Sequence, residues 1–419
     1  MKYVVVGGGI AGVSCAYELL KNLRSPDDEV VLISASEHVK TVSNWTKRKS
    51  SCFVFIFPNN ISFLVLQTVA GAVSYDRLNI ATGAWPRSPY KSSKIFVLRD
   101  ADSATRLQQL LKDKKSVAII GNGGIATELV YELRNVNIDW IIRDRYPSSV
   151  FFLPEVSKFL ERRVLAGRTE GSKTAGLIKR ERFEVEPTTS GDGCALGPDW
   201  NSSVLLKGGS EDHQVHFHCS TEVLSVREED NRLELTLSDG STIVSELAIW
   251  AIGVDPATEL WKEMRTSVKD VFACGDVCTV NWKNRSTSWK QMRLWTQARQ
   301  MGLYAARTML AAGGEKTELD FCFELFAHVT YFCGMKVVLI GDYKAERQPA
   351  DVWYTRERII GEDEYVCCVM AHHRVVGATL IGETHLEETL ENLILNQTDL
   401  SQLEEHFLDP GIDIEDYFD

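Results

Sequence analysis

Residues Lys2 to Gly12 read KYVVVGGGIAG, an apolar run that leads directly into a G-x-G-x-x-G pattern. A continuous apolar run of this length is typical of a strand that is buried on both faces of a parallel sheet. Residues 13–22 then repeat apolar side chains at helical spacing, and Glu29–Ile33 is a second apolar run. The order of strand, glycine loop, helix and strand predicts a βαβ unit that binds a dinucleotide.

Each glycine of this first loop meets a separate steric requirement. Gly7 permits a tight turn, Gly9 lets the backbone approach a pyrophosphate, and Gly12 lets the helix pack on the strand. The pyrophosphate is then expected at the positive end of the helix, beside Ile10 and Ala11.

The position after the second strand departs from the dinucleotide-binding pattern. An acid usually binds the ribose hydroxyls there, whereas this chain has Ser34, with Glu37 three residues later. A hydroxyl group hydrogen-bonds a ribose less strongly than a carboxylate does. Two outcomes stay open, a reduced affinity for the adenosine half or a contact from Glu37.

A second unit of the same kind follows in the chain. Ser116–Ile120 is an apolar run, Gly121 to Glu128 read GNGGIATE, and Ile138–Ile142 is another apolar run. Alanine is a permitted third member of the glycine pattern. Arg143 and then Asp144 follow; arginine favours the 2′-phosphate of NADPH and aspartate the free hydroxyl of NADH, so the choice stays open. Two units imply two dinucleotides with hydride transfer between them.

The composition excludes several classes of protein. At 419 residues the chain fits two or three domains, and 44% hydrophobic residues are enough to fill their cores. The net charge of −12 opposes direct binding to nucleic acid or to an anionic membrane. Ten scattered cysteines indicate reduced thiols in the cytoplasm and nucleus, and no pair has the spacing of a metal site.

Three further motifs point to a known family. Tyr75–Ala84 reads YDRLNIATGA, Ala251–Pro256 reads AIGVDP, and Asp270–Asp276 reads DVFACGD. With the two glycine loops, these motifs resemble the signatures of the pyridine nucleotide-disulfide oxidoreductase superfamily. The resemblance implies an α/β fold in which two Rossmann-like domains bind FAD and NAD(P)H and are followed by an α+β C-terminal domain.

The resemblance, together with the loop positions, assigns residues to each cofactor. The residues predicted to contact FAD are Gly7, Gly9, Ile10, Ala11, Gly12, Ser34, Thr82, Gly83, Gly275 and Asp276. The residues predicted to line the NAD(P)H site are Gly121, Gly123, Gly124, Ile125, Glu128 and Arg143.

The order of the motifs divides the chain. We expect residues 1–100 and 245–312 to form a split FAD domain and residues 101–244 to form the NAD(P) domain. A loop-rich insertion is predicted at about 165–215, where glycine, serine and threonine are frequent. Residues 313–419 form the predicted C-terminal domain, which ends in an acidic tail. Segments 47–68 and 257–265 depart from the pattern of the family.

The cysteines decide which redox chemistry is expected. A disulfide reductase uses two cysteines beside the flavin, and the chain has neither the C-x4-C nor the C-x-x-C form of that pair. Cys274 and Cys278, at C-x3-C spacing, leave a disulfide reductase open as an alternative, although a small residue packed at the end of a strand also explains Cys274. Without a dithiol, we expect electrons to pass from the flavin to oxygen or to a small acceptor.

Two further side chains are candidates for catalysis. The weak catalytic candidates are Glu128, Cys274 and Cys278. Glu128 could position the nicotinamide, but a glutamate in the first turn of a helix is equally explained as a partner of the helix dipole. His328 lies among apolar residues, which is typical of an interior histidine whose hydrogen bonds are satisfied.

The resemblance is strongest to one eukaryotic branch of the superfamily, over stretches such as Gln291–Gly302 and Asp409–Asp419. That branch is associated with the tRNA ligase complex, whose oxygen-sensitive catalytic subunit it protects when it binds with NAD(P)H. The resemblance therefore implies a protein partner. The alternative is a redox-gated binding protein whose turnover is incidental.

Overall fold

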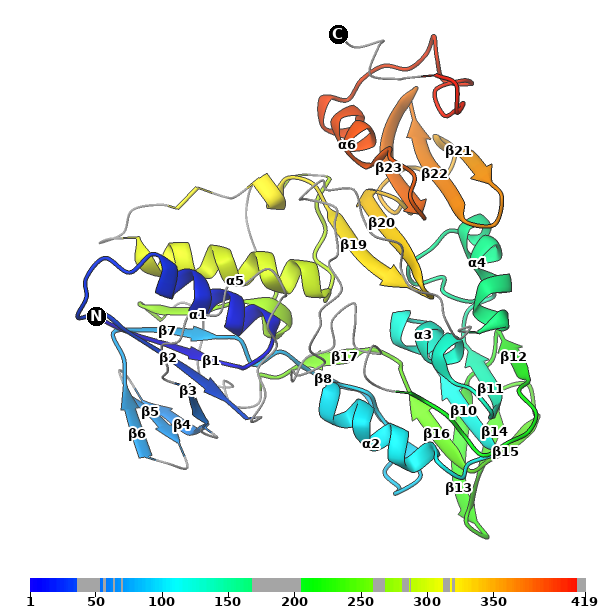
Figure 1. Cartoon of the computed structure of the whole chain (residues 1–419), viewed down its shortest axis with the longest axis horizontal. Coiled ribbons are helices and arrows are strands. Elements are labelled where there is room, and N and C mark those ends of the chain that lie inside the picture. Colours follow the sequence, from blue (N-terminus) through cyan, green and yellow to red (C-terminus); the bar gives the residue numbers. More distant parts are fainter. Residues whose placement is uncertain are drawn as a thin grey trace.

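The computed structural model describes residues 1–35, 53–55, 58–62, 65–68, 71–167, 205–258, 268–280, 286, 288–311, 317–318 and 321–412. Outside the described residues lie Glu37, Cys52, part of segment 47–68, most of segment 257–265, most of the predicted insertion and the last seven residues of the acidic tail. Two parallel sheets and a C-terminal antiparallel sheet confirm the predicted α/β class with an α+β C-terminal unit (Figure 1). No helix in the described part of the chain is long and apolar enough to cross a bilayer.

The first unit is a five-stranded parallel sheet with the strand order β18-β7-β1-β2-β3. Its strands are β1 (Lys2–Val6), β2 (Glu29–Ser34), β3 (Phe53–Phe55), β7 (Arg77–Ile80) and β18 (Val271–Ala273). The glycine loop links β1 to α1 (Ile10–Lys21), as the pattern predicts. A small antiparallel sheet of β4 (Pro58–Ser62), β5 (Val65–Thr68) and β6 (Gly71–Ser74) lies in the same unit.

Helices α1 and α5 (Trp295–Leu310) lie side by side on one face of the first sheet (Figure 1). Gly302 is the reason they approach so closely, because a Cβ atom there would lie 2.2 Å from the carbonyl oxygen of Ala11. The two helices and the sheet enclose one core, in which Val5, Leu19 and Met309 are fully buried.

The second unit repeats this plan with the strand order β12-β11-β10-β16-β9, all parallel. Its strands are β9 (Ile95–Phe96), β10 (Ser116–Ile120), β11 (Asn137–Ile142), β12 (Val215–Cys219) and β16 (Leu247–Trp250). Alternate residues of β10 face opposite sides. Val117 and Ile119 face a core that includes residues of α2 (Ala101–Leu111), α3 (Gly124–Glu132) and α4 (Pro154–Ala166).

On the other side, Ala118 and Ile120 of β10 face an antiparallel sheet. That sheet consists of β13 (Val223–Glu229), β14 (Arg232–Leu237) and β15 (Thr242–Ser245). The second sheet is therefore covered on both faces, which explains why its neighbouring strands β10 and β16 are almost entirely apolar.

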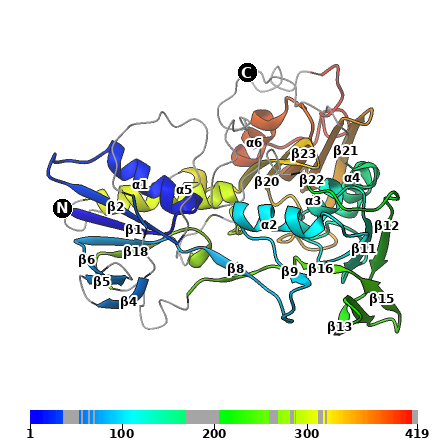
Figure 2. The same ribbon diagram turned by 60° about the horizontal axis from the view of Figure 1, so that its bottom comes forward.

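The predicted boundaries at 100/101 and 244/245 are wrong by one strand each. Both β9 and β16 belong to the second sheet: β16 pairs with β10 on one side and with β9 on the other. The crossings between the units therefore precede Ile95 and follow Trp250. There, β8 (Ala84–Pro86) and β17 (Val254–Pro256) form a two-stranded antiparallel link (Figures 1 and 2).

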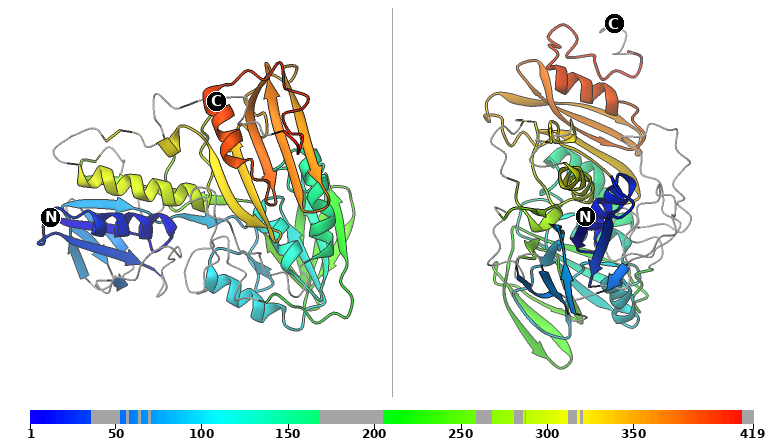
Figure 3. Two further views of the ribbon diagram at one scale, coloured as in Figure 1. Left: turned by 45° about the horizontal axis from the view of Figure 1, so that its top comes forward. Right: turned by 90° about the vertical axis from the view of Figure 1, so that its left-hand side faces the viewer.

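The C-terminal unit is an antiparallel sheet with the strand order β19-β20-β23-β22-β21 (Figure 3). Its elements are β19 (Ala327–Phe332), β20 (Met335–Gly341), β21 (Trp353–Ile360), β22 (Glu364–Ala371), β23 (Arg374–Ile381) and α6 (Glu387–Asn396). Cys367 and Cys368 lie on opposite faces of β22 and both are buried. Cys367 packs in the core of the second unit, and Cys368 packs beneath α6.

Candidate dinucleotide sites

The first glycine loop has the tight geometry that its pattern predicts. Gly7 has a φ of +129°, and its N–H donates to the carbonyl oxygen of Ile33 at 2.7 Å. A Cβ atom at Gly7 would lie 2.0 Å from the carbonyl oxygen of Ala81. A Cβ atom at Gly12 would lie 1.9 Å from the carbonyl oxygen of Gly7. The steric roles predicted for these two glycines are therefore confirmed.

Gly9 differs from its neighbours because it lies in open space. A Cβ atom there would meet no described atom within 4 Å. Gly9 is also the N-cap of α1, and no side chain caps this helix end. Because the side chains of Ile10 and Ala11 are buried, these residues can offer a ligand only their backbone N–H groups. An open glycine at an uncapped helix N-terminus suits a pyrophosphate.

Other predicted FAD residues gather at the same edge of the first sheet. Gly275 has a φ of +76°, and a Cβ atom there would lie 2.7 Å from the Cβ of Ala11. Thr82 follows β7, and its hydroxyl donates to the carbonyl oxygen of Ala257 at 3.1 Å. Gly83 accepts a hydrogen bond from the backbone of Ala257 at 2.9 Å. The structure therefore brings residues that are nearly 200 positions apart to the start of α1.

Two further FAD candidates carry polar side chains. Asp276 is half-buried, and its burial raises the pKa of the carboxyl group to about 6, while the charge of Arg293 opposes this rise. Ser34 is buried at the end of β2, at the position where an acid was expected. The open Gly9, the uncapped helix and the partly buried carboxyl of Asp276 together fit a flavin dinucleotide.

The second glycine loop has the same construction. Gly121 has a φ of +135°, and a Cβ atom there would lie 2.2 Å from the carbonyl oxygen of Ala251. Gly123 is the N-cap of α3, which no side chain caps, and a Cβ atom there would meet nothing within 4 Å. At Gly124 a Cβ atom would lie 3.3 Å from the ring of Phe151, and Ile125 packs against the core. This arrangement fits a nicotinamide dinucleotide.

Asn122, the variable residue within the second loop, was missed by the sequence analysis. Its Nδ2 donates to Asp144 Oδ2 at 2.8 Å and to Ser149 Oγ at 2.7 Å. Its Oδ1 accepts the N–H of Ser148 at 2.5 Å. The residue thereby fixes the segment that follows β11. The only signal in the sequence was a polar side chain at a variable position.

Arg143 and Glu128, both predicted for the second site, have different neighbours. Arg143 has a side chain that is 77% exposed, and its Nε lies 3.8 Å from Glu222 Oε1. Glu128, on α3, contributes with Glu132 to the raised pKa of the Cys333 thiol, after the larger effect of burial. Glu128 therefore lies near the β19–β20 turn of the C-terminal unit.

Cys274 and Cys278 are not placed as a reactive dithiol. Cys274 is 1% exposed and its Sγ accepts a hydrogen bond from Asn79 Nδ2 at 3.1 Å. Burial raises the pKa of Cys274 to about 12 and that of Cys278 to about 11. Both thiols are therefore protonated near neutral pH, whereas a redox-active cysteine requires a thiolate.

His328 is an interior histidine, as predicted. Its Nδ1 lies 2.9 Å from the hydroxyl oxygen of Thr296 in the first turn of α5. Burial lowers its pKa to about 4, so the ring is neutral near pH 7. The histidine joins α5 to the C-terminal sheet.

Comparisons with known proteins agree with this geometry. The family model of pyridine nucleotide-disulphide oxidoreductases matches residues 36–168 and 201–302. The Mus musculus protein named pyridine nucleotide-disulfide oxidoreductase domain-containing protein 1 is 36% identical over 493 residues, which span 100% of this chain and 98% of that protein. The protein of the same name from Drosophila melanogaster is 38% identical over 471 residues, with coverage of 100% and 99%.

Solved structures show the same fold at low sequence identity. A ferredoxin reductase from Rhodopseudomonas palustris has a TM-score of 0.71 and 16% identity, with 99% of each chain covered. A water-forming NADH oxidase from Lactobacillus brevis, bound to NADH, has a TM-score of 0.66 and 17% identity, with coverage of 96% and 92%. Since the family model matches more than half of the chain and the relatives match its full length, the chain belongs to the pyridine nucleotide-disulphide oxidoreductase family of FAD- and NAD(P)H-dependent enzymes.

Proposed function

We propose that the chain is an NAD(P)H oxidase. In the net reaction NAD(P)H, a proton and O₂ give NAD(P)⁺ and H₂O₂, and a small two-electron acceptor can replace oxygen. One observation carries the proposal: two nucleotide loops of matching geometry occur in one chain, and burial raises the pKa values of Cys274 and Cys278, the cysteines on either side of Gly275 and Asp276, so both stay protonated. Among the described cysteines, reduced flavin then has no reactive dithiol to receive its electrons.

The residues have separate roles in this proposal. When bound, the nicotinamide supplies a hydride that the flavin accepts and passes on. The backbone at Gly9 and at Gly123 binds one pyrophosphate each at a helix N-terminus. Asp276 would hold a hydroxyl group of the flavin side chain, and its position beside Gly275, which lies against Ala11 at the start of α1, supports this role. Asn122 orders the backbone beside the second site through its hydrogen bonds to Asp144 and Ser149.

The test is the absorbance of the purified chain during addition of NADH and then NADPH in air, together with an assay for H₂O₂. We expect a flavin spectrum that bleaches and recovers while peroxide accumulates. A chain that stays colourless after incubation with FAD contradicts the flavin assignment.

The disulfide reductase is tested by replacing both cysteines, with Cys274→Ser and Cys278→Ser in one chain. We expect the flavin content and the rate of NAD(P)H oxidation to stay within about twofold of the unmodified chain, because protonated thiols are poor nucleophiles and do not relay electrons by disulfide exchange near neutral pH. Loss of turnover with the flavin still bound establishes the disulfide reductase instead.

We further propose that the chain acts in the cytoplasm and nucleus and protects an oxygen-sensitive protein partner, such as the metal-dependent subunit of the tRNA ligase complex. The net charge of −12 supports a basic protein as the partner rather than RNA. Binding of that subunit, with and without NADPH, is measured for the chain and for Gly121→Trp, which blocks the second loop. Binding that neither nucleotide nor substitution changes excludes redox-gated association.

A further inference from the structure

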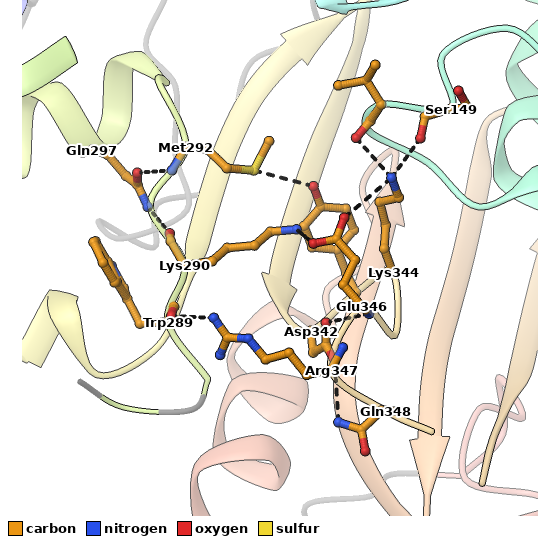
Figure 4. A network of polar contacts seen from close by, with 12 residues as sticks. Ser149, Trp289, Lys290, Met292, Gln297, Asp342, Lys344, Glu346, Arg347 and Gln348 are labelled. Carbon is orange, nitrogen blue, oxygen red and sulfur yellow. Dashed lines mark hydrogen bonds and ion pairs between the residues drawn. The ribbon is translucent and has the colours of Figure 1, made fainter. Parts of the chain in front are cut away.

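The segment 342–348, which links β20 to β21, lies between the two candidate sites. Figure 4 shows Lys344 reaching the segment that follows β11 in the second unit. Its ammonium group donates to the carbonyl oxygens of Ser149, at 2.7 Å, and Val150, at 3.2 Å. The same nitrogen lies 3.5 Å from Glu346 Oε1. A side chain of the C-terminal unit thus holds the backbone beside the second nucleotide loop.

The backbone that Lys344 holds is also fixed by the glycine loop itself. Asn122 accepts the N–H of Ser148 and donates to the hydroxyl group of Ser149. Phe151 follows directly and packs where Gly124 begins α3. A shift of this segment would therefore move residues that border the nucleotide.

Glu346 continues the contacts toward the first site. Its Oε2 lies 3.0 Å from Lys290 Nζ, and that ammonium group lies 4.5 Å from the centre of the Tyr343 ring. Arg347 donates to the carbonyl oxygen of Trp289 at 2.6 Å. Asp342 accepts the backbone N–H groups of Glu346 and Arg347, both at 3.0 Å, which orders the segment (Figure 4).

The residues around Lys290 are tied in turn to α5. Gln297, in the first turn of α5, donates to the carbonyl oxygen of Lys290 at 2.7 Å and accepts the N–H of Met292 at 2.7 Å. Ala298 follows, and its Cβ lies 4.0 Å from the place of a Cβ atom at Gly275. Direct polar contacts therefore run from the second glycine loop, through segment 342–348, to the helix beside the first loop.

The burial of the two lysines strengthens their contacts, although their shared partner Glu346 is 48% exposed. The side chains of Lys290 and Lys344 are only 16% and 18% exposed. Hydrogen bonds from a charged donor are stronger than neutral ones, and little water competes for partly buried ions. Hydride transfer also requires that the two reacting rings be held close together and aligned.

We propose that Lys344 and Glu346 are positioning residues that set the placement of the second nucleotide site relative to the first. The inference rests on the proposed function, since it concerns transfer between those two sites. The C-terminal unit is then part of the catalytic architecture, although its residues need not touch either nucleotide.

The first test is hydrogen exchange of the whole chain, without nucleotide, for Lys344→Met, Lys344→Arg and Glu346→Gln. We expect faster exchange of the amides at 144–151 in Lys344→Met and a smaller change in Glu346→Gln. Lys344→Arg should restore protection, because a guanidinium group also donates to two carbonyl oxygens. Unchanged exchange in Lys344→Met overturns the proposal, and this readout does not depend on activity.

The second test is the rate of flavin reduction at saturating NADPH, measured by rapid mixing. We expect Lys344→Met to slow reduction about tenfold while the flavin content stays unchanged, because misplacement of a reacting group lowers the rate. Lys336→Met is the matched control, since Lys336 is a partly buried cation that pairs with Glu383 and Glu387 inside the C-terminal unit. An equal loss in both variants indicates general destabilisation and refutes the positioning role. If the unmodified chain binds no flavin, the proposed function fails, and the exchange experiment alone decides the present proposal.

Discussion

The tight turn at Gly121 leaves no room for a Cβ atom, so a single added carbon should distort the second nucleotide loop. Gly121→Ala places a Cβ atom 2.2 Å from the carbonyl oxygen of Ala251 in a backbone with φ of +135°. We expect the turn to open, with a loss of at least about tenfold in the affinity for adenosine 2′,5′-bisphosphate and a lowered melting temperature.

Gly240→Ala is the matched control for that substitution. Gly240 also has a positive φ, +86°, but a Cβ atom there would meet nothing within 4 Å. Backbone strain alone should cost about 1 kcal/mol and leave nucleotide affinity unchanged. Calorimetric titration of both variants decides the matter, and equal affinities would contradict the steric explanation.

The choice between NADH and NADPH is also made by single residues. The carboxylate of Asp144 already accepts a hydrogen bond from Asn122, whereas the side chain of Arg143 is exposed. We therefore expect a preference for NADPH. On binding, the guanidinium group of Arg143 would leave Glu222 and pair with the 2′-phosphate. Arg143→Ala should weaken adenosine 2′,5′-bisphosphate about tenfold and leave AMP nearly unaffected. Arg227→Ala serves as the control, because Arg227 is also an exposed arginine beside carboxylates. If Arg143→Ala weakens the binding of adenosine 2′,5′-bisphosphate and of AMP equally, Arg143 does not recognise the 2′-phosphate, and the result favours NADH.

At the scale of elements, the junction of α5 with β19 predicts a dependence on pH. The pKa of His328 is lowered to about 4 from an ordinary value of 6.5, so the unfolded chain binds a proton there at a higher pH than the folded chain. Stability is therefore complete above about pH 6.5 and is lost as the pH falls toward 4. Between pH 6.5 and 5 the loss is on the order of 2 kcal/mol.

His328→Gln tests this dependence. Glutamine retains a hydrogen-bonding group for Thr296 and does not titrate. Urea unfolding at pH 7 and pH 5 should show a smaller decrease in the free energy of unfolding for the variant than for the unmodified chain. Asp276, whose raised pKa acts in the opposite direction, is present in both chains and cancels in the comparison. Equal decreases assign the acid sensitivity to other groups.

At the scale of the whole molecule, the separate cores predict that damage to one unit spares the other. Gly302→Val forces α5 away from α1, because even a Cβ atom would lie 2.2 Å from Ala11. We expect loss of bound flavin, measured by absorbance after incubation with FAD. Binding of adenosine 2′,5′-bisphosphate should persist, since the second site lies over a different core.

Leu237→Ala is the control for a general loss of stability. Leu237 is 1% exposed in the core between the second sheet and the antiparallel sheet β13–β15. We expect a cost of about 2–5 kcal/mol with the flavin retained. Flavin loss in both variants would show that the chain unfolds as one cooperative unit.

The sequence predicted the local units of the fold and missed how they are combined. The strands and helices around Gly7 and Gly121 follow from apolar runs and glycine spacing, because a βαβ unit is specified by contacts close in the chain. The predicted boundaries assigned the segments of β9 and β16 to the first unit, whereas they pair in the second sheet. This pairing joins segments about 150 residues apart whose short apolar runs carry no information about their neighbours. Asn122 was missed for another reason: its partners Asp144, Ser148 and Ser149 lie in an irregular segment whose path the sequence pattern does not predict.

By itself, the sequence determined that this chain has two dinucleotide loops, an α/β fold and no C-x-x-C or C-x4-C pair. Glycine is fixed by steric demands that are local, so its spacing can be recognised without a structure. Only the tertiary structure decided that Cys274 and Cys278 are held as thiols, because burial sets their pKa values. It also decided that Lys344 of the C-terminal unit holds the second site, because a hydrogen bond between units depends on how separate sheets pack together.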